Sequence, residues 1–213
     1  MREPIDFYFD FISPYAYIAS TQIEAVAARH GRSVTFRPVL LGITVMKVMG
    51  LKPLMETPLK SDYLRHDGPR MAKVYGVPFR YHGLKGINSL AACRAFLWIG
   101  RTDAALAVRF AHAVFRALWV DGRDITPADT VAEIAGALGV DAAELRAGIA
   151  SEPGKLALNA AVEAAIGRGV FGVPYVIADG EPLWGADRLW MLDHWLGHHA
   201  WDGAGLAALA AGR

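Results

Sequence analysis

Cysteine is almost missing from this sequence, since Cys93 is the only one among 213 residues. One cysteine cannot form a disulfide within the chain, which excludes a small fold that disulfides hold together. The neighbours of Cys93 are alanines and an arginine in a helical pattern. A free thiol in such a position is more often buried and inert than reactive, and we therefore expect Cys93 in the core.

An excess of charge and a long apolar run are also missing. The 22 basic and 21 acidic residues leave a net charge of +1, which does not indicate a nucleic-acid partner. No apolar run reaches the roughly 18 residues of a membrane span, and residues 1–6 lack the pattern of a signal peptide. No histidine has a spacing typical of metal ligands. We expect a cytoplasmic enzyme without a metal, a membrane partner or a nucleic-acid partner.

The clearest local signal lies where an apolar strand at residues 5–11 meets Ser13 and Pro14. Serine is a preferred N-cap residue and proline suits the first helical position, so a helix can begin at Pro14. Free N–H groups at a helix start stabilise an anion, and a thiolate beside Ser13 fits that description. No Asp-His relay is close in the sequence, so nothing identifies Ser13 as a hydrolase nucleophile. The alternative is that Ser13 is only a cap.

The order of expected elements predicts an α/β fold with a helical insertion. Strands at 5–11 and 33–39 enclose a helix at 14–30, and Gly31 occupies a usual C-terminal capping place. After Val173-Pro174, a short strand turns at Asp179-Gly180, and a second strand ends before a last helix near residue 187. The pattern between these parts is helical at 44–49, 59–75, 88–100, 102–120, 127–138, 141–150 and 152–168.

Five segments in this order resemble the 2-hydroxychromene-2-carboxylate isomerases and the related kappa-class glutathione transferases of the thioredoxin superfamily. They are Phe9-Asp10-Phe11, Ser13-Pro14-Tyr15-Ala16-Tyr17, Phe36-Arg37-Pro38-Val39-Leu40-Leu41-Gly42, Gly169-Val170-Phe171-Gly172-Val173-Pro174 and Trp184-Gly185-Ala186-Asp187-Arg188-Leu189. The resemblance implies a thioredoxin-like domain at 1–43 and 152–213, a helical insertion domain at 44–151, and a cis bond before Pro174. Ser13-Pro14-Tyr15-Ala16 stands where disulfide oxidoreductases of the superfamily carry Cys-x-x-Cys, which excludes dithiol chemistry.

The resemblance also implies glutathione as cofactor and a small aromatic carboxylate as substrate. Ser13 would be catalytic and would keep the glutathione sulfur as thiolate. The other positions that match glutathione-binding residues are Lys47, Val173, Pro174, Trp184 and Asp187, and those that match substrate residues are Lys60, Tyr63 and His66. Simpler roles remain open: an N-cap for Asp187, a core position for Trp184, and plain surface positions for the lysines.

One position departs from the family pattern. Leu51 replaces an asparagine that contacts glutathione in the family, which would weaken cofactor binding. Three functions therefore remain open. The preferred one is an isomerase of aromatic degradation that returns glutathione unchanged, acting as a homodimer. The second is a kappa-type transferase that consumes glutathione, and the third is a thioredoxin-like binding module without catalysis.

Overall fold

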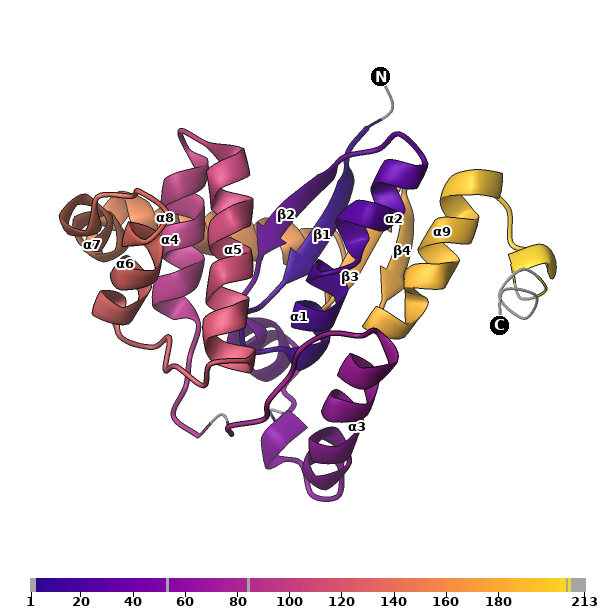
Figure 1. Ribbon diagram of the computed structural model, residues 1–213, viewed down its shortest axis with the longest axis horizontal. Helices are drawn as coiled ribbons and strands as arrows, with labels where there is room; N and C mark the ends of the chain where they lie inside the picture. The colour runs from indigo at the N-terminus through magenta and orange to yellow at the C-terminus, as the bar shows by residue number, and fades with distance from the viewer. Residues whose placement is uncertain (1–2, 53, 84, 206, 208–213) are drawn as a thin grey trace.

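A central sheet of four strands organises the molecule. The computed structural model describes residues 3–52, 54–83, 85–205 and 207 (Figure 1). The strands β1 (Ile5–Phe9), β2 (Val34–Pro38), β3 (Tyr175–Ala178) and β4 (Glu181–Trp184) lie in the order β2-β1-β3-β4. β2 runs parallel to β1, whereas β3 is antiparallel to both β1 and β4. This mixed sheet and its helices give the thioredoxin-like α/β fold that the sequence predicts.

The helix expected at 14–30 is two helices, which corrects that prediction. They are α1 (Pro14–Ser20) and α2 (Ile23–Arg29). The hydroxyl groups of Ser20 and Thr21 donate to the carbonyls of Tyr17 and Ile18 in the preceding turn, at 2.7 and 2.8 Å. Such local bonds compete with the continuing helical ladder, which explains the break. Gly31 has φ +64° just past α2, in the expected capping place.

A run of helices follows β2 and precedes α8 (Glu152–Gly167). Its members are the π-helix η1 (Gly42–Val48), the 3-10 helix η2 (Leu54–Glu56), α3 (Lys60–Val74), α4 (Leu90–Gly100), α5 (Ala104–Trp119), α6 (Ala128–Gly136) and α7 (Ala142–Ala150). The ends of the α-helices lie within two residues of the predicted ones. Figure 1 shows α4 to α7 grouped on one side of the sheet and α3 set apart below α1. The division into a thioredoxin-like domain at 1–43 and 152–213 and a helical insertion at 44–151 stays a proposal. Residues 1–2 and 208–213, at the two ends of the first domain, lie outside the described residues.

The helical run and the sheet share one core. Phe9 of β1 packs against Phe96 of α4 and Phe115 of α5, with ring centroids 5.3 and 5.6 Å apart. Cys93 of α4 is fully buried in the same core, and its burial raises the pKa of the thiol well above the usual value. The expectation of an inert core cysteine is confirmed.

The C-terminal part forms the expected hairpin. Asp179 and Gly180 both have positive φ, at 53° and 84°, as a two-residue turn between β3 and β4 requires. The chain then enters the short 3-10 helix η3 (Ala186–Arg188) and α9 (Leu189–His198). None of the helices that the structure describes is long and apolar enough to cross a membrane.

Candidate active site

Ser13, at the start of α1, links the N-terminal part of the chain to the C-terminal part. Its side-chain oxygen accepts a hydrogen bond from Ala16 N at 3.1 Å, so it caps the helix as predicted. Its hydroxyl group donates to the carbonyl oxygen of Val173, 160 residues away, at 3.4 Å. Ser13 is only 5% exposed, and the Val173-Pro174 bond is cis, which confirms the expectation for this bond. The structure therefore brings Ser13, Val173 and Pro174 together.

Asp10 fixes the loop that carries Ser13, a role that the sequence did not predict. Its carboxylate accepts hydrogen bonds from Ile12 N at 3.2 Å and from Leu41 N at 2.8 Å. Asp10 is 1% exposed, and this burial raises its pKa against the opposing bonds from Ser89 and Leu41. One buried carboxylate thus holds the loop after β1 against the loop after β2.

A second segment, at residues 185–187, also contacts Pro174. Gly185 N donates to the Pro174 carbonyl at 2.9 Å. Gly185 has φ +112°, and a Cβ at this position would lie 2.4 Å from Asp187 Oδ1. Glycine is therefore required here for the backbone conformation and for the room that the Asp187 carboxylate occupies.

Asp187 is not an N-cap, which corrects the simpler interpretation of this residue. The capping positions of η3 and α9 are Gly185 and Arg188, and neither helix has a side-chain capping bond. The Asp187 side chain is 57% exposed and pairs with the Arg188 guanidinium. The Asp187 carboxylate is thus open to solvent, two residues after the Gly185 N–H that bonds to Pro174.

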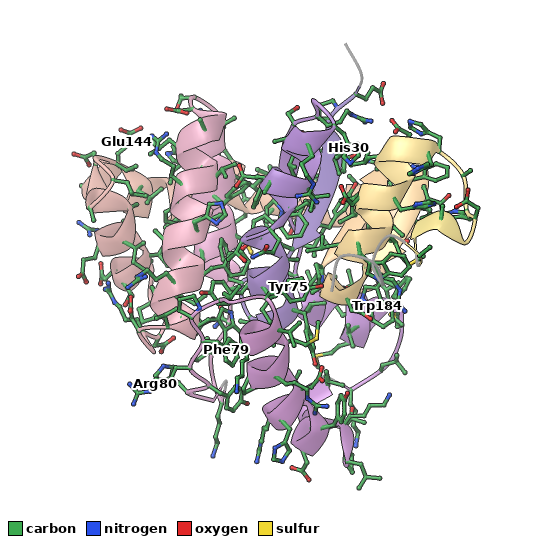
Figure 2. All side chains as sticks on the ribbon, turned by 45° about the vertical axis from the view of Figure 1, so that its right-hand side comes forward. His30, Tyr75, Phe79, Arg80, Glu144 and Trp184 are labelled. Atoms are coloured by element: carbon green, nitrogen blue, oxygen red, sulfur yellow. The ribbon has the colours of Figure 1, made fainter. Side chains whose placement is uncertain are left out.

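Trp184 is neither a core residue nor a neighbour of Ser13 by its contacts. It is 55% exposed, so the core interpretation is wrong. The Trp184 side chain is labelled in Figure 2. Its ring centroid lies 4.9 Å from that of Phe171 in an edge-to-face arrangement. A Cβ at Gly172 would lie 2.9 Å from Trp184 Nε1, so the indole covers the backbone just before Val173. Trp184 therefore supports the Pro174 loop through Phe171 and Gly172.

The remaining predicted residues lie on η1 and α3 and are exposed. Lys47 belongs to η1, Lys60 begins α3, and Tyr63 and His66 follow on the next turns of α3. Tyr63 is 59% exposed, and its hydroxyl group donates to Asp67 Oδ1 at 3.1 Å. Leu51, which follows η1, is 53% exposed. Among the residues that the structure describes, no hydrogen bond or ion pair joins the two lysines or His66 to Ser13.

Two tyrosines link α3 to neighbouring helices, another feature that the sequence did not predict. The Tyr15 hydroxyl group donates to Asp67 Oδ2 at 2.6 Å. Burial and then the bond to Asp67 raise the pKa of Tyr15 well above its usual value. The Tyr75 hydroxyl group donates to the carbonyl of Ala186, the residue before Asp187, at 2.9 Å. α3 is thereby tied to both α1 and η3.

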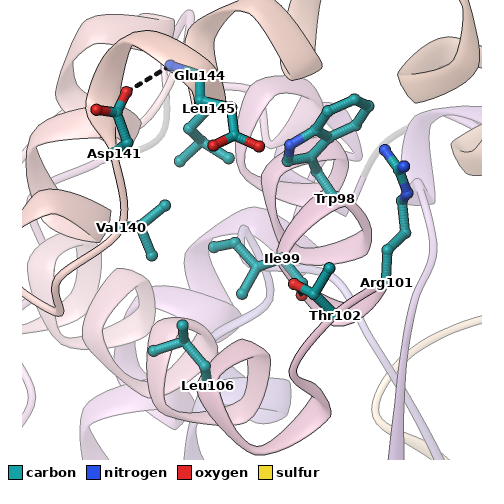
Figure 3. Close-up of a pocket in the computed structure, with 9 residues that line it drawn as sticks. All are labelled: Trp98, Ile99, Arg101, Thr102, Leu106, Val140, Asp141, Glu144 and Leu145. Atoms are coloured by element: carbon teal, nitrogen blue, oxygen red, sulfur yellow. Dashed lines mark hydrogen bonds between the residues drawn. The ribbon is translucent and has the colours of Figure 1, made fainter.

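A separate cavity of about 230 Å³ lies between α4, α5 and α7 (Figure 3). It is lined by Trp98, Ile99, Arg101, Thr102, Leu106, Val140, Asp141, Glu144 and Leu145. None of the predicted site residues is among them. Within the part of the chain that the structure describes, no group of three or more metal-ligating side chains comes together.

Comparison with known proteins assigns the family. The family model "DSBA-like thioredoxin domain" matches residues 4–197. A 2-hydroxychromene-2-carboxylate isomerase of Pseudomonas sp. (strain C18) is 30% identical, over 91% of this chain and 90% of that protein. A solved structure of a 2-hydroxychromene-2-carboxylate isomerase superposes with a TM-score of 0.82 at 29% identity, covering 92% of this chain and 95% of that one. The human glutathione S-transferase kappa 1 is 26% identical over 91% of this chain and 90% of its own. The chain therefore belongs to the DsbA-like thioredoxin domain family, together with the 2-hydroxychromene-2-carboxylate isomerases.

Proposed function

We propose that the protein is a glutathione-dependent isomerase that converts 2-hydroxychromene-2-carboxylate to trans-o-hydroxybenzylidenepyruvate in the degradation of aromatic compounds. One observation carries the proposal. The hydroxyl group of Ser13 lies beside the Val173 carbonyl, in a chain that matches isomerases along nearly the whole length of both proteins. In the disulfide oxidoreductases of the fold a cysteine pair would occupy this place, whereas this chain has Ser13 and Ala16.

The Val173 backbone and the Asp187 carboxylate have the chemistry that binding of glutathione requires. A peptide backbone at Val173 can pair with an extended ligand in the way that an added strand pairs with a sheet edge. The exposed Asp187 carboxylate, for which Gly185 leaves room, suits the γ-glutamyl amine. When bound, glutathione would supply a nucleophilic thiolate, whose reversible addition would make the conjugated double bond of the ring-opened substrate a single bond and so permit rotation.

Ser13 would hold the sulfur as an anion by donating its proton toward it. At 3.4 Å the present bond to the Val173 carbonyl is long for an O–H···O contact, whose usual distance is about 2.7–2.8 Å. Turning the hydroxyl group away from Val173 therefore costs little. The Ser13 oxygen can keep its bond from Ala16 N meanwhile, because a hydroxyl oxygen accepts and donates at once.

Charged and aromatic groups on η1 and α3 would bind the rest of the ligands. The exposed cations Lys47 and Lys60 can meet the glycine carboxylate of glutathione and the carboxylate of the substrate. Tyr63 and His66 would contact the aromatic part. Apolar side chains are exposed along the same stretch of chain, which suits an aromatic substrate or a second copy in a homodimer. They are Met46, Val48, Met49, Leu51, Leu54 and Leu59. We propose a cytoplasmic homodimer.

A stoichiometric assay tests the function. The enzyme should bring 2-hydroxychromene-2-carboxylate to equilibrium with its isomer, over many turnovers per glutathione, with glutathione at one hundredth of the substrate concentration, and the free thiol should be recovered at the end. Consumption of one glutathione per product with a halogenated aromatic acceptor would instead indicate a transferase, which the kappa-class relative makes the second candidate. A protein that does not bind glutathione in calorimetry would be a binding module.

A further inference from the structure

Asp67 of α3 connects two tyrosines on different helices. Its Oδ2 accepts from the Tyr15 hydroxyl group at 2.6 Å, and its Oδ1 accepts from the Tyr63 hydroxyl group at 3.1 Å. Arg70 Nε lies 3.7 Å from Oδ1. The Asp67 side chain is 15% exposed, in contrast to the 59% exposure of Tyr63. A largely buried carboxylate therefore fixes an aromatic residue that faces solvent.

This bridge lies next to Ser13. Tyr15 is two residues after Ser13, and Gly68, which follows Asp67, packs on the proline between them. A Cβ at Gly68 would lie 3.9 Å from Pro14 Cβ and 3.5 Å from the Phe79 ring. The α3 helix thus rests on the first turn of α1, where Ser13 is the cap.

The apolar attachment of α3 is small. Of its fifteen residues only Leu64, Gly68 and Ala72 are buried, one on each successive turn. Two of these three have little or no side chain, so they contribute little apolar area. Hydrogen bonds to a charged acceptor are stronger than neutral ones, and beside this narrow seat Asp67 accepts one from Tyr15 of α1. Its carboxylate is therefore a main determinant of how the start of α3 sits on α1.

We propose that Asp67 is a positioning residue that holds Tyr63 as one wall of the substrate site. With Oδ2 occupied by Tyr15, Oδ1 directs the Tyr63 proton inward, and the Tyr63 oxygen then presents its lone pairs to the ligand. An oxygen arranged in this way accepts a hydrogen bond from a phenolic hydroxyl group. Such a group forms when a hydroxychromene ring opens, so the inference rests on the proposed isomerase function and adds a preference for substrates with a phenol.

Four variants test the role through steady-state kinetics: Asp67→Asn, Tyr63→Phe, the double variant and Asp62→Asn. Asp62 is the matched control, because it lies on the same helix with its side chain 75% exposed. We expect each of the first two to raise KM for the chromene about fivefold, which corresponds to about 1 kcal/mol at 25 °C. The double variant should be within twofold of either single one, and the control should match the wild type.

Two outcomes would overturn the proposal. If KM of the double variant rises by the product of the single effects, Asp67 does not act through Tyr63. An unchanged KM for Tyr63→Phe overturns it as well, even where Asp67→Asn does not fold. If Asp67 had only a structural role, Asp67→Asn would lower the unfolding temperature, and its effect on KM would add to that of Tyr63→Phe.

Hydrogen exchange separates this proposal from the proposed function. Amides of residues 61–74 should exchange at least tenfold faster in Asp67→Asn than in Asp62→Asn, whereas those of β1 should not differ. Equal exchange in both variants would refute the anchoring role whatever the reaction is. If exchange behaves as expected but the wild type does not isomerise the chromene, the bridge stands and the isomerase function fails.

Discussion

Replacement of Ser13 by alanine is the most direct test of the site, because two effects of this change can be separated. The side chain caps α1 through Ala16 N at 3.1 Å, and loss of such a cap costs about 1 kcal/mol. In a chain of this length that loss lowers the unfolding temperature by about 2–4 °C. If Ser13 also donates to an anionic sulfur, loss of that bond removes about 1.4 kcal/mol of stabilisation, and turnover falls at least about tenfold.

Ser151 provides the matched control for this variant. It caps α8, and its side-chain oxygen accepts from Gly154 N at 3.1 Å, with a proline in the first turn as after Ser13. Its hydroxyl group also donates to a carbonyl, that of Gly148 at 2.7 Å. We expect Ser151→Ala to lose similar stability in differential scanning calorimetry and to keep the wild-type kcat.

The kinetic assay decides between the two roles of Ser13. Initial rates for the chromene are measured at saturating glutathione over a range of pH. If Ser13→Ala keeps the wild-type kcat and the same pH profile, Ser13 is only a cap. An equal fall in kcat for Ser13→Ala and Ser151→Ala would assign the loss to stability, and the reasoning from the Val173 contact would be wrong.

Three further variants extend the test. Leu51→Asn should bind glutathione roughly three- to a hundredfold more tightly in calorimetry, since it restores one or two contacts of about 0.5–1.5 kcal/mol each, and equal affinity would mean that residue 51 does not face the ligand. Asp187→Asn should weaken that binding at least about tenfold with an unchanged unfolding temperature, because the residue caps no helix. Burial opposes the ionised form of Asp193, yet bonds from Arg29 and His30 lower its pKa below the usual value. The contacts of ionised Asp193 with Arg29 and His30 therefore stabilise the fold fully at a pH above about 4, the pKa of an aspartate in the unfolded chain. This contribution disappears as pH falls through the lower pKa that Asp193 has in the folded state. Asp193→Asn should cost up to about 1 kcal/mol in urea unfolding at pH 7 and nothing near pH 2, whereas an equal loss at both would contradict this.

Features that depend on near neighbours in the chain were predictable. Ser13 with Pro14 marks the start of α1, and Asp179-Gly180 marks the hairpin, because the preferred backbone angles of these residues decide the local structure. The contact between Ser13 and Val173 could not be predicted from near neighbours in the chain. It spans 160 residues, and only the resemblance of several segments in order indicated it.

Local patterns were misleading where side chains rather than spacing decide the outcome. The apolar pattern of 14–30 predicted one helix, but the hydroxyl groups of Ser20 and Thr21 end α1 early. Aspartate is a preferred N-cap residue, yet the chain turns at Gly185 with φ +112° and η3 begins at Ala186. Asp187 therefore lies inside η3 and does not cap it. Neither effect follows from hydrophobic periodicity.

Asp10 shows which signal in the sequence could have identified a residue that holds the site together. It stands between Phe9 and Phe11 in the apolar stretch at residues 5–11, and a carboxylate in such surroundings is stable only if several donors reach it. The alternation of an acid with two aromatic residues therefore already required partners. Their identity did not follow, since Leu41 N comes from another loop, 31 residues along the chain. A buried acid beside a predicted active residue thus predicts a hydrogen-bonded support for that residue, and only the fold can say which loop supplies the donors.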